Sequence, residues 1–308
     1  ESRRGGHLWL FFEEKVQGKD ARAFGRGLLA AHEIERVEVF PKQDQLDTGP
    51  GSLIRMPFGV HRVARRRYGF CGPDGSLLAS AGDDAAIRLW EWENGEMVGR
   101  LAEHTGDVWT VDFSPDGAYL ISGAEDNFFN LWDVEAQELA WANNDHEDWV
   151  TAVAFSPEWP YAVSGSNDQT IRYWNMETHE QLWCVGELDG CTGANDGSVR
   201  SVVFSQDGSQ ILVGANEARI FDAATGELLH EIEVNKRVNS AVFAPRIGTI
   251  LTGSSDSTIQ LWDIATGQEI KRFDGHNGQT RSVAFSPDGT LVASASVDQT
   301  VRVWQLYD

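Results

Sequence analysis

From residue 70 onward, apolar and polar positions alternate in short runs, and the runs recur about every 42 residues. The alternation in VWTVDF and TIQLW has the period of two expected of β-strands. Pro-Asp-Gly and Gly-x-x-Asp turns separate the runs, which favours antiparallel pairing. An aromatic residue closes each unit, with steps of 42, 42, 47, 41 and 42 residues between Trp90, Trp132, Trp174, Phe221, Trp262 and Trp304. The pattern therefore predicts six consecutive all-β units.

Residues 1–70 do not repeat and show a mixed pattern. An amphipathic helix is expected from about Asp20 to His32, with Phe24, Leu28 and Leu29 on one face. Strands are expected at His7–Phe12, Val37–Phe40 and Ser52–Met56. This is half of an α/β domain, so we expect a partial α/β segment over 1–60 followed by the repeat domain over 61–308.

The repeat carries recognisable dipeptides: Trp-Asp at 132–133 and 262–263, and Gly-His at 275–276. With about 42 residues per unit, the region 70–308 resembles the WD-repeat β-propeller family. The resemblance implies a propeller of six recognisable repeats, with six or seven blades and four strands per unit. Ring closure then needs a strand from the N-terminal side, supplied by residues 53–63 or by a part of the protein missing from this sequence.

In that family a His, a Ser or Thr, an Asp and the closing Trp form a buried hydrogen-bonded chain. The resemblance implies this structural, non-catalytic role for His104, Ser122, Asp126 and Trp132; His146, Ser164, Asp168 and Trp174; and His276, Ser294, Asp298 and Trp304. His61, Ser80, Asp84 and Trp90 would complete a first-unit network, which makes RRRYGF the innermost strand of that unit. The fourth unit departs from the pattern, with Val213, Asn216 and Phe221 in place of Ser, Asp and Trp.

The WD-repeat resemblance also implies a scaffold or sensor that binds a protein or peptide on one rim. Residues at the start of the inner strands line that rim: Trp109, Thr151, Arg200, Asn239 and Arg281, with Trp149 and Arg237 just before their strands. Trp and Arg are the types enriched in binding hot spots. The alternative is that Trp109 and Trp149 pack between neighbouring blades.

The front segment has three motifs in order: SRRGGHLWLFF, EVFPKQD and GPGSLIRMPFGVHRVARRRYGF. They resemble the C-terminal part of the archaeo-eukaryotic primase-polymerase superfamily. The resemblance implies that His7 and Arg3 or Arg4 face the nucleotide triphosphate, and that Arg55 contacts nucleotide phosphates. It implies a metal ligand at Glu38, or alternatively at Asp44. The alternative for Arg3 and Arg4 is a solvated surface charge.

An intact domain of this superfamily implies a divalent Mg or Mn ion and a nucleoside triphosphate. Its paired acidic motif is not found in residues 1–70, and two-metal catalysis needs several carboxylates. We therefore expect no catalysis and no cofactor from this chain alone. The alternative function is the C-terminal piece of a metal-dependent primase-polymerase, a nucleotidyltransferase whose catalytic carboxylates lie upstream.

The balance of basic and acidic residues differs between the two parts of the chain. Residues 1–70 hold 13 Lys and Arg against 9 Asp and Glu, whereas residues 71–308 hold 12 against 38. Because acidic surfaces repel phosphate backbones, nucleic acid is expected only at the basic front segment, unless a local Arg cluster overrides this in the repeats. The sequence contains no run of 18 apolar residues, so no membrane span is expected.

Three cysteines, Cys71, Cys184 and Cys191, are an odd and sparse set that favours a reducing, cytoplasmic location over a disulfide framework. We therefore do not expect a bond between Cys184 and Cys191. The Gly-rich insertion at 185–197 contains Asp189 and Asp196, but their spacing matches no calcium loop, and we expect a solvated loop.

Overall fold

The computed structural model describes residues 67–71, 77–91, 95–186, 190–192, 197–234, 236–245, 248–286 and 288–306. By internal contacts the chain divides between Ile54 and Arg55, and all described residues belong to the second part. The expected α/β segment, His61 and the expected strand donor at 53–63 lie outside the described residues.

The described residues form 23 strands and no helix. Five sheets have four strands and one has three, and in every sheet consecutive strands pair antiparallel. The first three sheets contain β1 (Arg67–Cys71), β2 (Leu77–Ala81), β3 (Ile87–Glu91) and β4 (Met97–Leu101); β5 (Val108–Phe113), β6 (Tyr119–Ala124), β7 (Phe129–Asp133) and β8 (Glu138–Asn143); and β9 (Val150–Phe155), β10 (Tyr161–Ser166), β11 (Ile171–Asn175) and β12 (Glu180–Val185).

The remaining three sheets follow the same order along the chain. They contain β13 (Ser201–Phe204), β14 (Gln210–Gly214), β15 (Ala218–Asp222) and β16 (Leu228–Ile232); β17 (Val238–Phe243), β18 (Thr249–Ser254), β19 (Ile259–Asp263) and β20 (Glu269–Phe273); and β21 (Thr280–Phe285), β22 (Leu291–Ser296) and β23 (Val301–Gln305).

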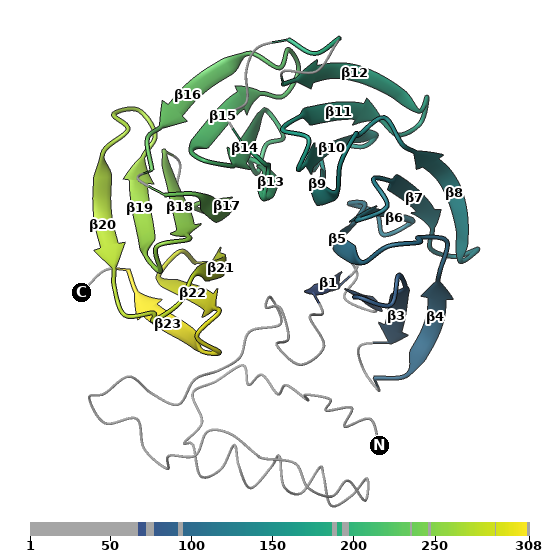
Figure 1. The fold of residues 1–308 in the computed structure, drawn as a ribbon, viewed down its shortest axis with the longest axis horizontal. Helices are drawn as coiled ribbons and strands as arrows, with labels where there is room; N and C mark the ends of the chain where they lie inside the picture. The colour runs from purple at the N-terminus through teal and green to yellow at the C-terminus, as the bar shows by residue number, and fades with distance from the viewer. Residues whose placement is uncertain are drawn as a thin grey trace, which may run out of the picture. The chain divides into compact units, whose positions relative to one another are not determined.

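Each sheet is one blade, and Figure 1 shows the blades fanned around a common centre. The innermost strands β1, β5, β9, β13, β17 and β21 each contact the next along the series. The six predicted units are therefore six blades, which confirms the all-β propeller prediction. The predicted inner strand in RRRYGF is also present, as β1.

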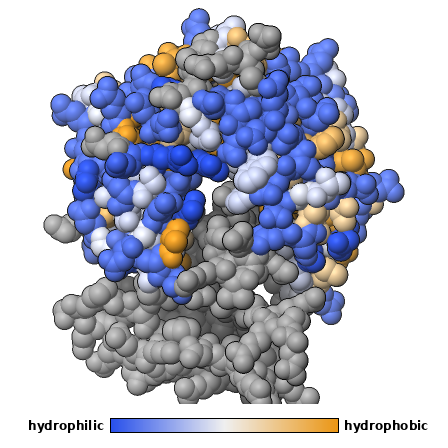
Figure 2. Space-filling model, viewed as in Figure 1, coloured by the Kyte–Doolittle hydropathy of each residue, from blue (hydrophilic) through white to orange (hydrophobic). Residues whose placement is uncertain are grey.

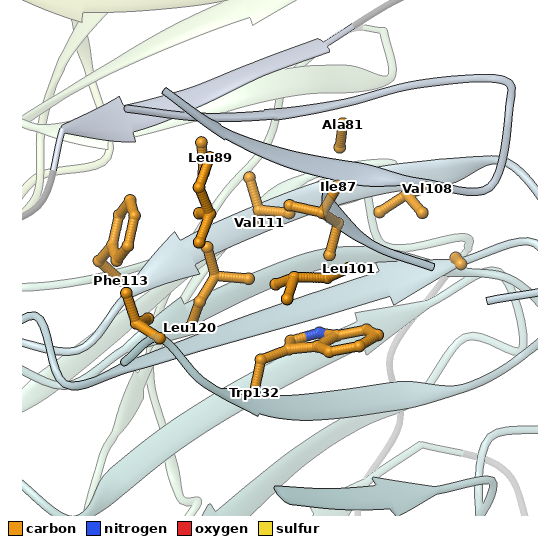
Figure 3. Packing of buried hydrophobic residues seen from close by; sticks show 12 residues of the cluster. Ala81, Ile87, Leu89, Leu101, Val108, Val111, Phe113, Leu120 and Trp132 are labelled. Carbon is orange, nitrogen blue, oxygen red and sulfur yellow. The ribbon is translucent and has the colours of Figure 1, made fainter. Parts of the chain in front are cut away.

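From the second blade onward, the closing aromatic packs against the blade before it. Trp132, 1% exposed, lies in one cluster with Ile87, Leu89 and Leu101 of the first blade (Figure 3). Trp174 packs likewise with Phe129 of the second blade. Burying a side chain of this size stabilises the fold by about 1.5–3 kcal/mol. This packing explains why an aromatic recurs every 42 residues or so.

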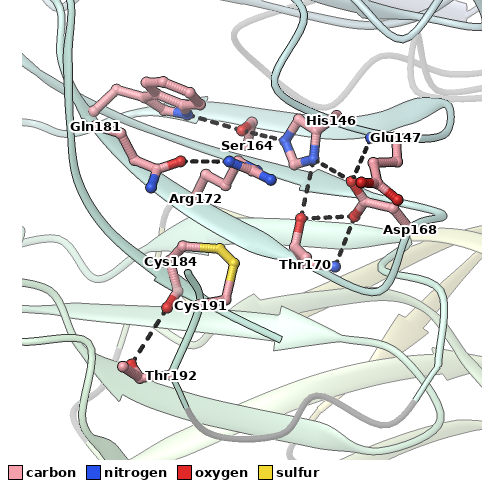
Figure 4. Close-up of a disulfide and its surroundings, with 11 residues drawn as sticks. His146, Glu147, Ser164, Asp168, Thr170, Arg172, Gln181, Cys184, Cys191 and Thr192 are labelled. Atoms are coloured by element: carbon pink, nitrogen blue, oxygen red, sulfur yellow. Dashed lines mark hydrogen bonds and ion pairs between the residues drawn. A yellow bond between two sulfur atoms is a disulfide. The ribbon is translucent and has the colours of Figure 1, made fainter. Parts of the chain in front are cut away.

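A buried hydrogen-bonded chain ties the strands of the third blade together (Figure 4). The Trp174 indole N–H donates to Ser164 Oγ at 2.9 Å, and Ser164 lies 2.8 Å from His146 Nε2. His146 Nδ1 lies 2.8 Å from Asp168 Oδ2. Because Ser164 accepts from the indole, its own proton points to Nε2, which leaves Nδ1–H to donate to the carboxylate.

The electrostatics agree with that assignment. Burial lowers the pKa of His146, so its imidazole is neutral at pH 7. Burial opposes ionisation of Asp168, but hydrogen bonds from His146 and Thr170 hold its pKa below the ordinary value. The Thr170 hydroxyl donates to Asp168 at 2.6 Å, a partner that the sequence analysis did not include.

The structure builds the same chain in two other blades and shortened versions elsewhere. His104 and His276 each join a serine and an aspartate, and each serine accepts from the closing Trp. In the fifth blade Thr252 accepts from Trp262 without a histidine. In the first, Trp90 donates to Ser80 at 2.8 Å, and Asp84 pairs with Arg88. In the fourth blade the closing Phe221 has no N–H to donate, so no hydroxyl acceptor is needed. Val213 occupies the position that serine has in the other blades.

The sequence analysis was wrong about the cysteines: Cys184 and Cys191 form a disulfide (Figure 4). The segment after β12 turns back on that strand, where Thr192 N–H donates to Cys184 O at 2.9 Å. A single bridge between Val185 and Thr192 then holds the two cysteine Cα atoms 4.6 Å apart. Cysteine count alone gave no sign of this local reversal. Asp189 and Asp196 lie outside the described residues.

Side chains of the inner strands also bond across blades. Asp112 of β5 accepts from Phe155 N–H of β9 at 2.8 Å. Burial raises the pKa of Asp112 to about 7, although the Phe155 N–H opposes that shift. A carboxylate thus lies between two blades in a setting that favours its protonated form.

The hydrogen-bonded chain predicts a large effect of Ser164→Ala. The change leaves the Trp174 indole N–H and His146 Nε2 buried without their partner. We expect a loss of about 2–3 kcal/mol in the free energy of unfolding, measured by urea denaturation. Thr178→Ala, an exposed hydroxyl in the same blade, is the control and should change stability by less than about 0.5 kcal/mol. Equal effects of the two changes would contradict the role of the chain.

Asp112 predicts a pH-dependent loss of stability. Because its folded pKa is raised, the folded state binds more protons than the unfolded state between about pH 4 and 7. Stability contributed by protonated Asp112 is therefore full at the acid end and is lost as pH rises through 7, by up to about 4 kcal/mol. Asp112→Asn keeps an acceptor for Phe155 and removes the titration.

The measurement is the difference in unfolding free energy between variant and wild type, at pH 5 and at pH 8. We expect Asp112→Asn to be the more stable protein at pH 8, with the advantage shrinking at pH 5. A difference that does not vary with pH would show that Asp112 is not the titrating group.

Candidate interaction surface

The backbone register places the predicted rim residues at one end of the inner strands. Val108 N–H donates to Gly82 O, Val199 N–H to Ser166 O and Val238 N–H to Ala215 O, so these three valines are equivalent. The residue after each valine is Trp109, Arg200 or Asn239. Thr151 and Arg281 follow Val150 and Thr280, the first residues of β9 and β21. For Trp109, Arg200 and Asn239 the equivalence predicted from the sequence is thus present in the hydrogen bonding.

Two of the predicted rim residues lie between blades. Thr151 is 2% exposed, and its hydroxyl donates to Val199 O of the connection to the next blade. Asn239 is 9% exposed, and its amide donates to Thr280 O of the next blade at 2.9 Å. Both side chains satisfy backbone carbonyls, so neither is open to a partner. Small polar residues at this register position were the sequence signal for such a bridge.

Trp109 and Trp149 form a stacked pair at the inner ends of β5 and β9. Their ring centroids are 5.9 Å apart and their planes differ by 18°. Trp109 is half-buried, whereas Trp149 is 37% exposed. The pair therefore packs across two blades, as one alternative from the sequence held, while Trp149 stays partly exposed, as the other required.

Arg200, Arg237 and Arg281 gather on three consecutive blades. Arg200 and Arg237 immediately precede β13 and β17, and Arg281 is the second residue of β21. Burial lowers the pKa of Arg200, and the charges of Arg237 and Arg281 lower it further. Burial and Arg237 lower the pKa of Arg281 in the same way. Each guanidinium stays charged at pH 7, so three positive charges repel one another here.

Both groups lie at the same end of the inner strands. Figure 2 shows strongly hydrophilic side chains beside the central opening, over the inner ends of β13, β17 and β21. A paler patch lies across the opening from them, over β5 and β9. We call Trp109, Trp149, Arg200, Arg237 and Arg281 the rim surface. Asp148, whose carboxylate favours the charged form of Arg200, is a neighbour that the sequence analysis did not include.

The predicted nucleotide and metal residues, Arg3, Arg4, His7, Arg55, Glu38 and Asp44, lie outside the described residues. Within the described part of the chain, no group of three or more His, Cys, Asp or Glu side chains is placed to hold a metal ion. No helix among the described residues is long and apolar enough to cross a membrane.

Comparison with known families finds two matches in different parts of the chain. Residues 95–133, 139–175, 226–263 and 267–305 match the WD domain, G-beta repeat. Residues 1–78 match the TOTE conflict system, Archaeo-Eukaryotic Primase domain. The gap between the second and third WD matches covers β12–β15, the unit in which Val213 and Phe221 replace the serine and the tryptophan.

Each of the known relatives aligns over about a third of the chain. Serine-threonine kinase receptor-associated protein of Gallus gallus is 34% identical over 109 residues, which are 35% of this chain and 31% of the relative. The protein of that name from Dictyostelium discoideum is 35% identical over 109 residues, 37% of its length. Apoptotic protease-activating factor 1 of Danio rerio is 33% identical over 111 residues, 9% of its length.

The fold, the hydrogen-bonded chains and these matches agree. The chain belongs to the WD-repeat β-propeller proteins, and its first 78 residues match an archaeo-eukaryotic primase domain.

Proposed function

We propose that this propeller is a protein-interaction scaffold that captures its partner on the rim surface. The observation that carries the proposal is the placement of a stacked Trp pair, of which Trp149 is exposed, and three Arg residues at the same end of the inner strands. Trp and Arg provide most of the binding energy in many interfaces, because they combine a large contact area with directional hydrogen bonds. Matches to WD repeats support protein binding in general.

The rest of the described surface is less suited to this task. Exposed apolar residues such as Met97, Leu139, Leu182 and Ile270 lie on the outer strands of different blades, one or two to a strand. Single exposed apolar residues are normal on soluble proteins and mark no site. The rim surface differs because its members come from five consecutive blades and lie at the same end of the inner strands.

A double change tests this proposal. Trp149→Ala with Arg281→Ala removes two exposed side chains, so we expect an unchanged melting temperature and at least a hundredfold loss of partner affinity. Partners captured by the full chain from cells of its source would be identified by mass spectrometry, purified and titrated by calorimetry.

The matched control pairs Trp159→Ala with Arg100→Ala. Both side chains are exposed, and they lie at the opposite end of β9 and on the outer strand β4. This control variant should bind the partner with the affinity of the wild-type protein. Full affinity in the rim variant would refute the assignment of the rim.

The match of residues 1–78 favours a second function, nucleotidyl transfer by a longer protein in which these residues complete a primase domain. In that protein His7 and Arg3 or Arg4 would contact the triphosphate, and Glu38 or Asp44 would help to hold Mg or Mn. Arg is suited to the phosphate contact because its planar fork binds two oxygens at once.

Primer synthesis by the full gene product, assayed with and without Mg²⁺ or Mn²⁺, tests the second function. We expect metal-dependent synthesis that His7→Ala reduces by at least a hundredfold and that Trp149→Ala leaves unchanged. Synthesis that does not respond to His7→Ala would remove this residue from the proposed nucleotide site.

A further inference from the structure

The disulfide between Cys184 and Cys191 lies in the connection that enters the fourth blade, between β12 and β13. The connections that enter the second, third and sixth blades are each tied to the following sheet by a buried histidine. The fourth blade has Val213 in place of the serine to which such a histidine bonds. This connection is thus held by a covalent bond in place of a hydrogen-bonded chain.

Among the described residues, three hydrogen bonds join the returning segment, residues 190–192, to the end of β12. Thr192 N–H donates to Cys184 O at 2.9 Å, and the Thr192 hydroxyl donates to the same oxygen at 3.3 Å. Gly186 N–H donates to Thr192 O at 3.4 Å. Thr192 is exposed, so water competes for each of these bonds. The position of the segment therefore depends on the disulfide.

The two sulfur atoms of the disulfide differ in their access to solvent. Cys184 is 4% exposed on β12, whereas Cys191 is partly exposed after the end of that strand. Thiol–disulfide exchange begins when a thiolate attacks one sulfur, and the other sulfur then leaves as a thiolate. A reductant in solution therefore attacks Cys191 Sγ, and Cys184 is the leaving group.

Arg172 lies beside that leaving group. It is the register partner of Cys184 across β11 and β12, so the two side chains lie on the same face of the sheet (Figure 4). Arg172 is 8% exposed, its Nη1 donates to Gln181 Oε1 at 2.6 Å, and its Nε is buried without a hydrogen-bond partner. In the part of the chain that the structure describes, no carboxylate forms an ion pair with this guanidinium. A thiolate at Cys184 would supply that anion.

We propose that the Cys184–Cys191 disulfide is a thiol–disulfide exchange site that a dithiol reduces, and that its redox state controls the connection leading to Arg200 on the rim surface. A buried cation without an anion is costly while the disulfide is closed, and reduction provides the opposite charge. A disulfide with a purely structural role would gain nothing from Arg172. The control of Arg200 rests on the proposed function, because it concerns the regulation of the same surface.

The exchange takes two electrons from the dithiol. Its first thiolate attacks Cys191 Sγ, the S–S bond breaks, and the electron pair stays on Cys184 Sγ beside Arg172. The second thiolate of the reductant then attacks the reductant's own sulfur in the mixed disulfide, and Cys191 leaves as a thiolate. The reductant departs as a disulfide. Of its two protons, one ends on Cys191 and the other goes to solvent, while Cys184 stays a thiolate.

Reduction releases the connection but leaves its far end attached to the propeller. Val199 N–H donates to Ser166 O at 3.0 Å, and Arg200 N–H donates to Gly214 O at 2.8 Å. Neither bond involves a cysteine, so both can form in the reduced protein. We expect them to open more often after reduction, because the chain that leads to them is then no longer held at Cys191.

The first experiment follows reduction of the folded full chain by dithiothreitol, with free thiols alkylated and counted by mass spectrometry. We expect complete reduction at an unchanged circular dichroism spectrum, and Arg172→Gln should slow the reduction by about fivefold or more. Arg88→Gln is the matched control. It removes the arginine at the same position of the third strand in the first blade, so the rate should equal that of wild type.

Hydrogen exchange measured by mass spectrometry tests the effect on the rim. In the peptide covering residues 198–204, the amides of Val199 and Arg200 should exchange at least about fivefold faster in the reduced protein than in the oxidised one. The equivalent stretch of the second blade, residues 107–113, should exchange equally in both states. Cys191→Ser should exchange as reduced wild type does, with or without dithiothreitol. Cys71→Ser keeps the disulfide and should respond as wild type does.

Three results would overturn the proposal: a disulfide that is reduced only when the protein unfolds, equal reduction rates for Arg172→Gln and wild type, or equal exchange of residues 198–204 in both redox states. Failure of the proposed function gives a different result. A captured partner that binds the Trp149→Ala, Arg281→Ala variant at full affinity refutes the rim and leaves these three measurements unaffected. A partner that needs Trp149 and Arg281, together with equal exchange in both states, preserves the scaffold and refutes redox control.

Discussion

The hydrogen-bonded chain from Trp through Ser and His to Asp determines where an inner strand begins. His146 lies between β8 of one blade and β9 of the next, so its bonds to Ser164 and Asp168 tie the connection between blades to the sheet that follows. Leaving any of these buried groups without a partner costs about 1–3 kcal/mol, which makes one arrangement strongly preferred. Trp149 lies three residues after that histidine, so its position on the rim follows from the network.

The connections leading to Arg200 and Arg237 lack that histidine and are held by other means. Before β13, the turn back on β12 and the bond from Val199 N–H to Ser166 O replace it. Before β17, Val238 N–H bonds to Ala215 O, and Asn239 bonds to the sixth blade. Arg200 N–H donates to Gly214 O, and Arg237 O accepts from Ser255 N–H, so the backbones of both arginines belong to this bonding. Among the described residues their guanidinium groups take no part in it, which fits a role of these side chains in binding.

The repeat made the fold predictable, because each period states the same strand pattern and the same buried aromatic. The strand pattern recurs in all six units, so the fold could be predicted even though the fourth unit departs from the consensus residues. There Phe221 keeps the packing of the closing residue but not its hydrogen bond. The rim was predictable only as a set of positions. Whether a side chain at such a position faces solvent, as Trp149 does, or bridges to the next blade, as Thr151 does, depends on contacts between residues 40 or more apart. The burial of Asp112 depends on such contacts too, whereas the disulfide depends on how the chain returns to β12 within seven residues, and composition reports neither.

The primase match overlaps the first blade of the propeller, and this overlap limits where the two regions can be separated. The primase match runs to residue 78, whereas the first blade begins with β1 at Arg67, so residues 67–78 belong to both. In the described structure β1 pairs with β2 and packs against β5, and β2 contributes Ala79 and Ala81 to the core shared with the second blade. Removing the matched stretch as a separable domain would therefore take the innermost strand from the propeller. A functional division of the protein that keeps the propeller whole must therefore fall before Arg67.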